Sequence, residues 1–401
     1  MRTVRVTAQL AAVTMVAAAL LYAPGASAQS LDSSLFAHPT RQSITLGGAY
    51  RAYTIGGAKV NESTALVSYE VRATHVRFRL DGTGVRFAAA ASTIQGTTPL
   101  GGKLDVIFSP GDTLTLEARS ASQPERLDSL QAVAIGSAGT STIDLESFAF
   151  GAPAMFGARG AKGVNLGDVM LSLRGGVDVE PKPSGRAAVY YRGTTVRGGA
   201  TLSGVVGTAN QLSAGFDVRK SFADSLGGKN LFPGGGDVTA KVALSALIEN
   251  PWDELDDELD ARVSIFYTRP FGDARNDQPN LLIPLGSTMG AYGSLTLPWG
   301  SVLLTPSLEL LRESSSADAT SGLVRATSTG TGWTTSLGLD AVIPVSSVVD
   351  ITPQAGYVFG NVAATFDKSV VRRRGRPVSR STSFSDRISG WFAGLELSLT
   401  F

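Results

Sequence analysis

Few residues of this chain have the types and spacing that catalysis requires. The sequence has two histidines, His38 and His75, and no cysteine. The missing cysteines exclude thiolate catalysis, disulfide bridges and Cys-based zinc sites. Walker A, His-Glu-x-x-His and Gly-x-Ser-x-Gly patterns are also absent. Neither histidine lies beside a serine nucleophile or an acid pair in a catalytic motif, so we expect no enzyme activity, no cofactor and no metal centre.

Clustered carboxylates form the first charged group that could bind a ligand. Five of the six residues from Asp253 to Glu258 are acidic, and Asp260 follows closely. Calcium prefers clustered oxygen ligands, but the segment lacks the glycine and the spacing of a calcium loop. We therefore favour a solvated turn, with calcium binding as the alternative.

A basic segment near the C-terminus is the second charged group. Between Lys368 and Arg387, Asp386 is the only acidic residue, and the basic residues are Lys368, Arg372, Arg373, Arg374, Arg376, Arg380 and Arg387. Arginine binds phosphate groups well. We predict an external loop that contacts lipopolysaccharide phosphates or maintains solubility, with capture of an anionic ligand as the alternative.

The composition limits the classes of protein to which these groups could belong. Lys and Arg total 35 and Asp and Glu total 34, so no overall positive charge favours nucleic acid. Hydrophobic residues make up 43% of the chain and charged residues 17%, which is too apolar for general disorder. After residue 28 the apolar residues occur in short alternating segments, never in a run long enough for a membrane helix.

The first 28 residues have the three parts of a secretory signal in order. Arg2 and Arg5 provide the positive charge, Leu10 to Ala23 is almost wholly apolar, and Ala26-Ser27-Ala28 is a cleavage pattern. We predict cleavage before Gln29, which leaves residues 29–41 as a short periplasmic segment. An uncleaved membrane anchor is the alternative.

The last eleven residues form an amphipathic strand. Trp391, Ala393, Leu395, Leu397, Leu399 and Phe401 alternate with small or polar residues, so one face of the strand is apolar. A final strand with this alternation and a terminal Phe resembles the assembly signal of Gram-negative outer-membrane β-barrels. The resemblance implies recognition of Trp391–Phe401 by the barrel assembly machinery and a location in the cell outer membrane. An edge strand of a secreted β-sandwich is the alternative.

The same alternation recurs upstream, and the connectors between these segments alternate in length. The segments are 212–218, 238–246, 261–267, 289–297, 302–310, 333–343 and 349–359. Residues 221–236, 270–286, 314–330 and 366–386 are long connectors, 250–259 is intermediate, and 298–300 and 344–348 are short. Short periplasmic turns and long external loops are typical of outer-membrane barrels. Residues 42–401 are thus predicted to form one barrel with a periplasmic C-terminus.

We predict an all-β fold, a single transmembrane antiparallel up-and-down barrel of about 14 strands, within a range of about 12 to 16. The further strands are expected at 43–54, 64–72, 76–80 with 85–91, 104–108, 113–118, 141–150, 163–175 and 186–202. Trp252 and Trp299 are expected at periplasmic turns, and Trp333 and Trp391 at external strand ends. Together with Phe401 they would form an aromatic girdle.

Charged residues on the polar faces of the strands are the candidates for lining the lumen. They are Asp217, Arg219, Lys241, Arg262, Glu309, Asp340, Asp350 and Glu396. Because side chains alone cannot fill so wide a barrel, we predict a passive channel or transporter for a small-molecule solute. A non-conducting barrel that serves adhesion or surface architecture through its loops is the alternative.

A second motif lies in the middle of the chain. Gly163-Val164-Asn165-Leu166-Gly167-Asp168-Val169 precedes the predicted strand Met170–Arg174. This strand entry resembles that of FadL-like hydrocarbon transporters and MetA-type barrels of phenol degradation, which implies a transporter. Residues 29–41 are shorter than the N-terminal plug of the fatty-acid transporters, so the resemblance is not taken to imply fatty acids as substrates.

Overall fold

The computed structural model describes thirteen stretches of the chain. They are residues 41–55, 58–89, 92–95, 100–109, 111–120, 154–180, 193–207, 210–222, 236–249, 258–271, 285–321, 323–370 and 378–401. Every regular element within them is a β-strand. None of the described residues form a helix with the length and hydropathy needed to span a bilayer.

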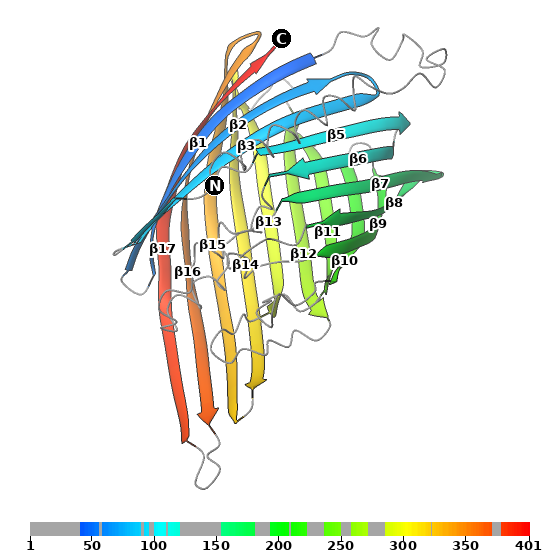
Figure 1. The fold of residues 1–401 in the computed structure, drawn as a ribbon. Helices are drawn as coiled ribbons and strands as arrows, with labels where there is room; N and C mark the ends of the chain where they lie inside the picture. The colour runs from blue at the N-terminus through cyan, green and yellow to red at the C-terminus, as the bar shows by residue number, and fades with distance from the viewer. Residues whose placement is uncertain are drawn as a thin grey trace, which may run out of the picture.

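The strands form one closed antiparallel barrel (Figure 1). Each ring strand pairs with its neighbours along the chain, and the first strand pairs with the last from Ser43↔Thr400 to Ile55↔Ile388. The strands are β1 (Arg41–Ile55), β2 (Ala58–Arg72), β3 (Val76–Ala89), β4 (Ser92–Gln95), β5 (Leu100–Ser109), β6 (Asp112–Arg119), β7 (Met155–Leu166), β8 (Val169–Val179), β9 (Thr194–Val206), β10 (Asn210–Phe222), β11 (Gly236–Glu249), β12 (Glu258–Phe271), β13 (Leu285–Trp299), β14 (Val302–Ser321), β15 (Val324–Ser346), β16 (Val349–Val370) and β17 (Val378–Thr400).

The ring has sixteen strands, because β4 is the one of the seventeen that pairs only with β3. The prediction of an up-and-down barrel is confirmed, whereas the count of about 14 was too low. Residues 163–175 were predicted as a single strand but span the tight turn between β7 and β8. Gly167 has a φ of +75° in this turn, a conformation that glycine adopts at little cost. The apolar residues on both sides of Gly167 concealed the turn.

The predicted alternation of short and long connectors is present only in part, because β14 ends at Ser321 and β15 begins at Val324, where a long connector was predicted. Tight turns join β5 to β6, β7 to β8, β13 to β14 and β15 to β16. Gln42 and Phe401 exchange two backbone hydrogen bonds, so both ends of the ring lie at this short-turn end. The segments 76–80 and 85–91, predicted separately, belong mainly to the single strand β3. The strand predicted at 141–150 falls outside the described residues.

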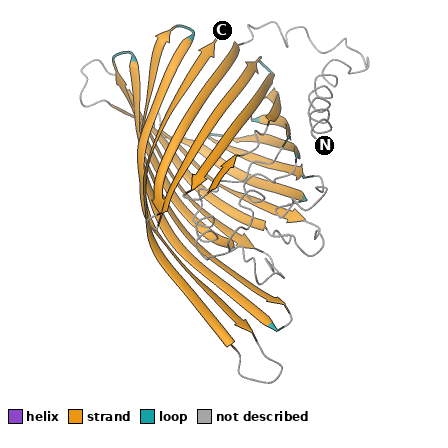
Figure 2. Ribbon diagram, turned by 60° about the vertical axis from the view of Figure 1, so that its left-hand side comes forward, coloured by secondary structure: helices purple, strands orange, loops and turns teal. Residues whose placement is uncertain are grey.

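Four strands are longer than predicted. Residues 314–330 and much of 366–386 were expected to be loops, but β14 continues to Ser321, β15 begins at Val324, β16 reaches Val370 and β17 begins at Val378. These two hairpins project well beyond the other strands at the end opposite the C-terminus (Figures 1 and 2). Their Ser, Thr, Ala and Gly residues lack apolar alternation because the hairpins need no lipid-facing side.

The basic segment changes accordingly. Lys368 and Arg380 are cross-strand neighbours near the ends of β16 and β17, not loop residues. Arg387 also lies on β17. Arg372, Arg373, Arg374 and Arg376 fall outside the described residues.

The two faces of the barrel wall differ in character. On one face, large apolar side chains are open to the surroundings; Ile265, Leu395 and Phe216 are 50–56% exposed. On the other face, carboxylates are covered by basic side chains, and the side chain of Asp178 is only 4% exposed. Since a barrel that spans a membrane presents apolar residues to lipid and polar residues to its lumen, the first face is the exterior and the second the inner wall.

Candidate functional site

The inner wall is the candidate functional site, and the strand register assigns residues to it. Cross-strand partners share a face, so the assignment passes from strand to strand around the ring. All eight predicted lumen residues lie on the inner face by this register. They divide into residues that are locked in ion pairs and residues that are not.

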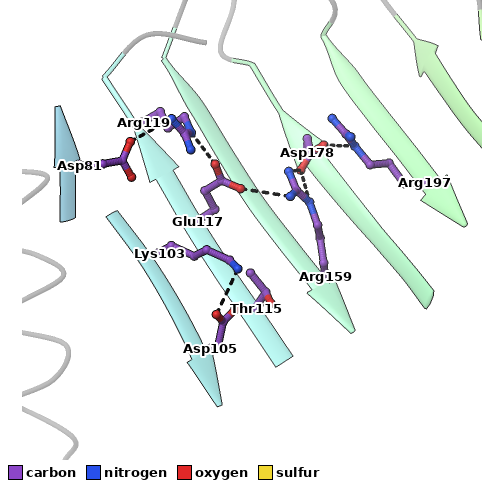
Figure 3. A network of polar contacts seen from close by, with 9 residues as sticks. All are labelled: Asp81, Lys103, Asp105, Thr115, Glu117, Arg119, Arg159, Asp178 and Arg197. Atoms are coloured by element: carbon purple, nitrogen blue, oxygen red, sulfur yellow. Dashed lines mark hydrogen bonds and ion pairs between the residues drawn. The ribbon is translucent and has the colours of Figure 1, made fainter. Parts of the chain in front are cut away.

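A chain of ion pairs crosses the inner wall from β3 to β9 (Figure 3). Arg119 Nη1 lies 3.3 Å from Asp81 Oδ2, and the same guanidinium contacts Glu117. Arg159 then joins Glu117, at 3.1 Å, to Asp178, at 2.9 Å. Arg197 also contacts Asp178 and ends the chain. We call Asp81, Glu117, Arg119, Arg159, Asp178 and Arg197 the ion-pair arc.

The carboxylates of this arc are its most covered members. The side chains of Asp178 and Glu117 are 4% and 8% exposed, whereas Arg159 and Arg197 remain 34% and 35% exposed. Asp178 and Glu117 each have two guanidinium partners, Asp81 has Arg119, and each of these arginines keeps part of its surface in the lumen. Charges this well covered are stable only when they are paired.

Glycines on the intervening strands let these long side chains lie flat on the wall. Asp81, Gly101 and Arg119 share one cross-strand row, and a Cβ on Gly101 would lie 3.3 Å from Asp81 Oδ2. Gly157 lies between Glu117 and Asp178, and Gly176 lies between Arg159 and Arg197. A Cβ would approach Asp178 Oδ1 to 2.6 Å at Gly157 and Arg159 Cγ to 2.7 Å at Gly176. Any larger residue at these positions would push the pairs away from the wall.

Further pairs extend the same arrangement around the ring. Arg174 reaches across Gly199 to Asp217 at 3.2 Å, and Arg219 Nε donates to Asp237 at 2.8 Å. Arg262 pairs with Asp260 at 2.6 Å, and Lys103 pairs with Asp105 at 3.1 Å. Three of the predicted lumen residues, Asp217, Arg219 and Arg262, are thus held in ion pairs.

None of the six residues of the ion-pair arc was among the predicted lumen residues, because the N-terminal half of the chain alternates less clearly. A signal was nevertheless present. Residues two apart on a strand share a face, and this spacing separates Glu117 from Arg119, Gly157 from Arg159, and Gly176 from Asp178. Charged residues and glycines at this spacing could have identified the inner wall.

On the strands β12–β17, two aromatic rings cover glycines of the inner wall. Phe392 of β17 lies across Gly356 of β16, and its ring reaches to 3.7 Å from the Cβ position of Gly338 on β15. Phe266 of β12 lies across Gly290 of β13 in the same way. An aromatic side chain that covers a cross-strand glycine shields the bare backbone there. We call Phe266, Gly290, Gly338, Gly356 and Phe392 the aromatic arc.

Four of the predicted lumen residues have neither an ion pair nor a hydrogen bond from their side chains within the described part of the chain. They are Lys241 on β11, Asp340 on β15, Asp350 on β16 and Glu396 on β17. Three of the four are acidic and lie on the strands of the aromatic arc. Glu309, the remaining predicted residue, lies opposite Tyr292 on the inner face.

The described residues of the predicted girdle lie on the exterior, and two of them, Trp391 and Trp333, lie beside other aromatic rings. Trp391 and Tyr50 have ring centroids 5.4 Å apart, and Trp333 and Phe359 have centroids 6.1 Å apart at 87°. Trp299 and Phe401 lie at the short-turn end, and Trp252 is outside the described residues. Trp333 and Trp391 do not lie at strand ends as predicted, because β15 and β17 continue past them into the projecting hairpins.

The described residues of the remaining candidate groups show no arrangement for catalysis or metal binding. His75 Nδ1 lies 2.9 Å from the Ile107 carbonyl oxygen, and His38 is outside the described residues. Of the acidic segment, Asp260 belongs to the pair with Arg262, while residues 253–257 are not described. No group of three or more His, Asp or Glu side chains in the described stretches could hold a metal ion.

No family model and no curated protein matches the chain. Solved structures with a similar course include OpdK of Pseudomonas aeruginosa with vanillate, at 9% identity and a TM-score of 0.42, covering 90% of this chain and 99% of OpdK. OccK2 (OpdF) of the same organism, in complex with glucuronate, is 14% identical with a TM-score of 0.36, and the match covers 90% of this chain and 96% of OccK2. OmpT, an outer membrane protein of Vibrio cholerae, is 10% identical with a TM-score of 0.39, and the match covers 90% of this chain and 97% of OmpT. Likenesses at this level do not extend to a substrate.

The architecture of the chain itself gives the class of protein. A closed antiparallel ring, an apolar exterior with clustered aromatics, a charged inner wall, and short turns at the end that carries both ends of the ring occur together. These are the features of transmembrane barrels of the outer-membrane type. The chain is an outer-membrane β-barrel.

Proposed function

We propose that this protein is a passive channel for small polar molecules across the cell outer membrane. The flat lattice of charges on the inner wall is the observation that carries the proposal. In a ring of sixteen strands, side chains that lie along the wall leave the centre to water. Glycines at Gly101, Gly157 and Gly176 keep these long side chains low. A barrel with a solid core would gain nothing from charged inner residues that need glycines beside them in order to lie along the wall.

The proposal includes the processing and the partners that the sequence suggests. Residues 1–28 would be removed as a signal peptide, and residues 29–41 would remain in the periplasm. Trp391–Phe401 would be recognised by the barrel assembly machinery, while lipid and lipopolysaccharide would surround the exterior. Chemistry at the described residues gives no support to an enzyme, since His75 is held against a backbone carbonyl.

The resemblance to FadL-like and MetA-type transporters adds little to this proposal. The residues that carry it, Gly163 to Val169, form the turn between β7 and β8. The hairpin geometry already accounts for Gly167 at its positive φ. A hydrocarbon substrate therefore has no support from the inner wall, which is charged around these strands.

Conductance in planar bilayers tests the proposal directly. We expect the refolded protein to give discrete, ohmic steps in potassium chloride. Lys241→Glu should shift the ion selectivity towards cations, because Lys241 is an inner-wall cation with no ion-pair partner among the described residues. Lys220→Glu is the matched control, since Lys220 lies on the exterior beside Phe222 and Phe271. A correctly inserted but electrically silent barrel would overturn the channel proposal.

The projecting hairpins favour a second function. β14–β17 extend well past the aromatic residues Trp333 and Trp391 and project as a tall sheet beyond the other strands (Figure 2). A silent barrel with this sheet would serve adhesion or surface architecture. If adhesion is the function, removal of the projecting parts of β14–β17 would abolish binding of the protein to other surfaces. If the protein is a channel, the shortened barrel would keep its conductance.

A further inference from the structure

The inner wall of β15–β17 combines an aromatic ring with unpaired carboxylates. The ring of Phe392 extends across Gly356 to Gly338 on β15. Asp340 is the next inward residue of that strand, and two residues along a strand span about 7 Å. The aromatic face and the carboxylate are therefore close enough to contact one small molecule together.

Polar groups continue from this position towards the short-turn end. Gln354 is the cross-strand partner of both Asp340 and Gly394, and its Oε1 lies 3.5 Å from the Cβ position of Gly394. Glu396 is the next inward residue of β17, and Asp350 lies at the turn. Ligands that enter past Phe392 would meet Asp340, Glu396 and Asp350 in that order.

The charges of this strip are not neutralised within the part of the chain that the structure describes. The side chains of Asp340, Glu396 and Asp350 take part in no ion pair there, unlike Asp178 of the ion-pair arc or Asp217 on β10. An unpaired carboxylate in a barrel wall attracts cations more strongly than one in open water. The adjacent ring favours cations that are weakly hydrated and partly apolar, because these can shed water and contact its face.

We propose that Phe392, Asp340 and Glu396 form a selectivity site for organic ammonium ions, small molecules that carry a protonated or quaternary amine on an apolar body. The inference rests on the proposed channel function and names its substrate class. Phe392 contacts the apolar and cationic parts of the solute, Asp340 binds the ammonium group, and Glu396 accepts it on the way to the periplasm.

Reversal potentials in planar bilayers test the site with benzyltrimethylammonium chloride and sodium benzoate as probes. The wild type should pass the aromatic cation in preference to the aromatic anion of similar size. Asp340→Asn should reduce this preference about threefold to tenfold, and Glu396→Gln by a smaller factor. Asp318→Asn is the matched control, because it removes the same charge from the projecting hairpin, where Asp318 pairs with Arg325 at 2.7 Å.

Phe392→Leu separates the ring from the charge. It should lower the permeability of benzyltrimethylammonium relative to potassium and leave the ratio of potassium to chloride nearly unchanged. Phe392→Tyr keeps the ring and should behave as the wild type, which guards against misfolding of the leucine variant.

The outcomes distinguish this inference from the function on which it depends. If no salt gives a current, both the channel and the site are refuted. A channel that conducts but prefers benzoate, or in which Asp340→Asn behaves as Asp318→Asn does, would refute the ammonium site and leave the channel intact.

Discussion

The ion-pair arc and the aromatic arc use the same backbone device for opposite purposes. In both, a glycine on one strand gives space to a long side chain from a neighbouring strand. On β3–β9 the glycines let acids and bases cover one another, so the charges are locked. On β12–β17 they support Phe266 and Phe392, and the carboxylates of Asp340 and Glu396 have no ion-pair partner in the part of the chain that the structure describes. One arc stabilises the wall, while the other is equipped to select solutes.

The largest effect on stability should come from adding a side chain at the glycine of the aromatic arc that Phe392 covers. A Cβ at Gly356 would overlap both the Phe392 ring and the Leu337 carbonyl oxygen, and a backbone atom cannot move aside cheaply. Gly356→Leu should lower the free energy of unfolding by about 3 kcal/mol or more, measured by urea titration in detergent micelles. Gly175→Leu is the control, because a Cβ at this exterior glycine would lie 3.9 Å from the nearest atom. Equal losses of stability in the two variants would show that Phe392 does not require a glycine at position 356.

Removing the charge of Asp178, the least exposed acid of the ion-pair arc, should lower the free energy of unfolding nearly as much as Gly356→Leu does. Asp178→Asn removes the charge that both Arg159 and Arg197 contact, and we expect a loss of about 2–3 kcal/mol in the same titration. Asp340→Asn, on the unpaired side, should change stability by no more than about 0.5 kcal/mol. The comparison between the arcs fails if Asp340 proves as important for stability as Asp178.

The exterior of the aromatic arc gives an intermediate effect. Trp391→Leu removes the ring contact with Tyr50 at 5.4 Å and should cost about 1 kcal/mol. Trp299→Leu provides the comparison, since Trp299 is 74% exposed at a turn and should cost less. The unfolding temperature of each variant in lipid vesicles would be measured from the different gel mobility of folded and unfolded protein in unheated samples. A greater loss of stability in Trp299→Leu than in Trp391→Leu would count against an aromatic cluster at Trp391.

The smallest effect is expected where the paired charges are open to water. Arg174 and Asp217 are 44% and 58% exposed, so screening leaves their pair worth less than about 0.5 kcal/mol. Asp217→Asn should therefore unfold close to the wild type at high and low salt alike. A loss comparable to that of Asp178→Asn would show that the whole charged wall acts as one unit.

Much of the barrel could be predicted from the C-terminal half of the sequence. The alternation that ends at Phe401 follows directly from contact with lipid on one side of the strand and with water on the other. All eight predicted lumen residues lie on the inner face for the same reason. Lipid imposes a strict pattern on each strand, and a strict pattern is visible in a single sequence.

Features that depend on register or lie outside lipid could not be predicted in this way. The pairing of Arg159 with both Glu117 and Asp178 requires knowledge of which residues are opposite one another on three strands. The projecting parts of β14–β17 have no lipid-facing side, so their strands resemble polar loops in the sequence. The turn at Gly167 was missed because apolar residues flank it closely.

The seam between β1 and β17 has a consequence for how the barrel forms. Every other ring contact joins strands that are neighbours along the chain, so hairpins can assemble locally. The seam joins the two ends, and the chain must lose much entropy before Ile55 meets Ile388 and Ser43 meets Thr400. Gln42 and Phe401 complete it with two reciprocal backbone hydrogen bonds. We therefore expect this seam to close after the hairpins have formed, with the Gln42–Phe401 hydrogen bonds at its short-turn end.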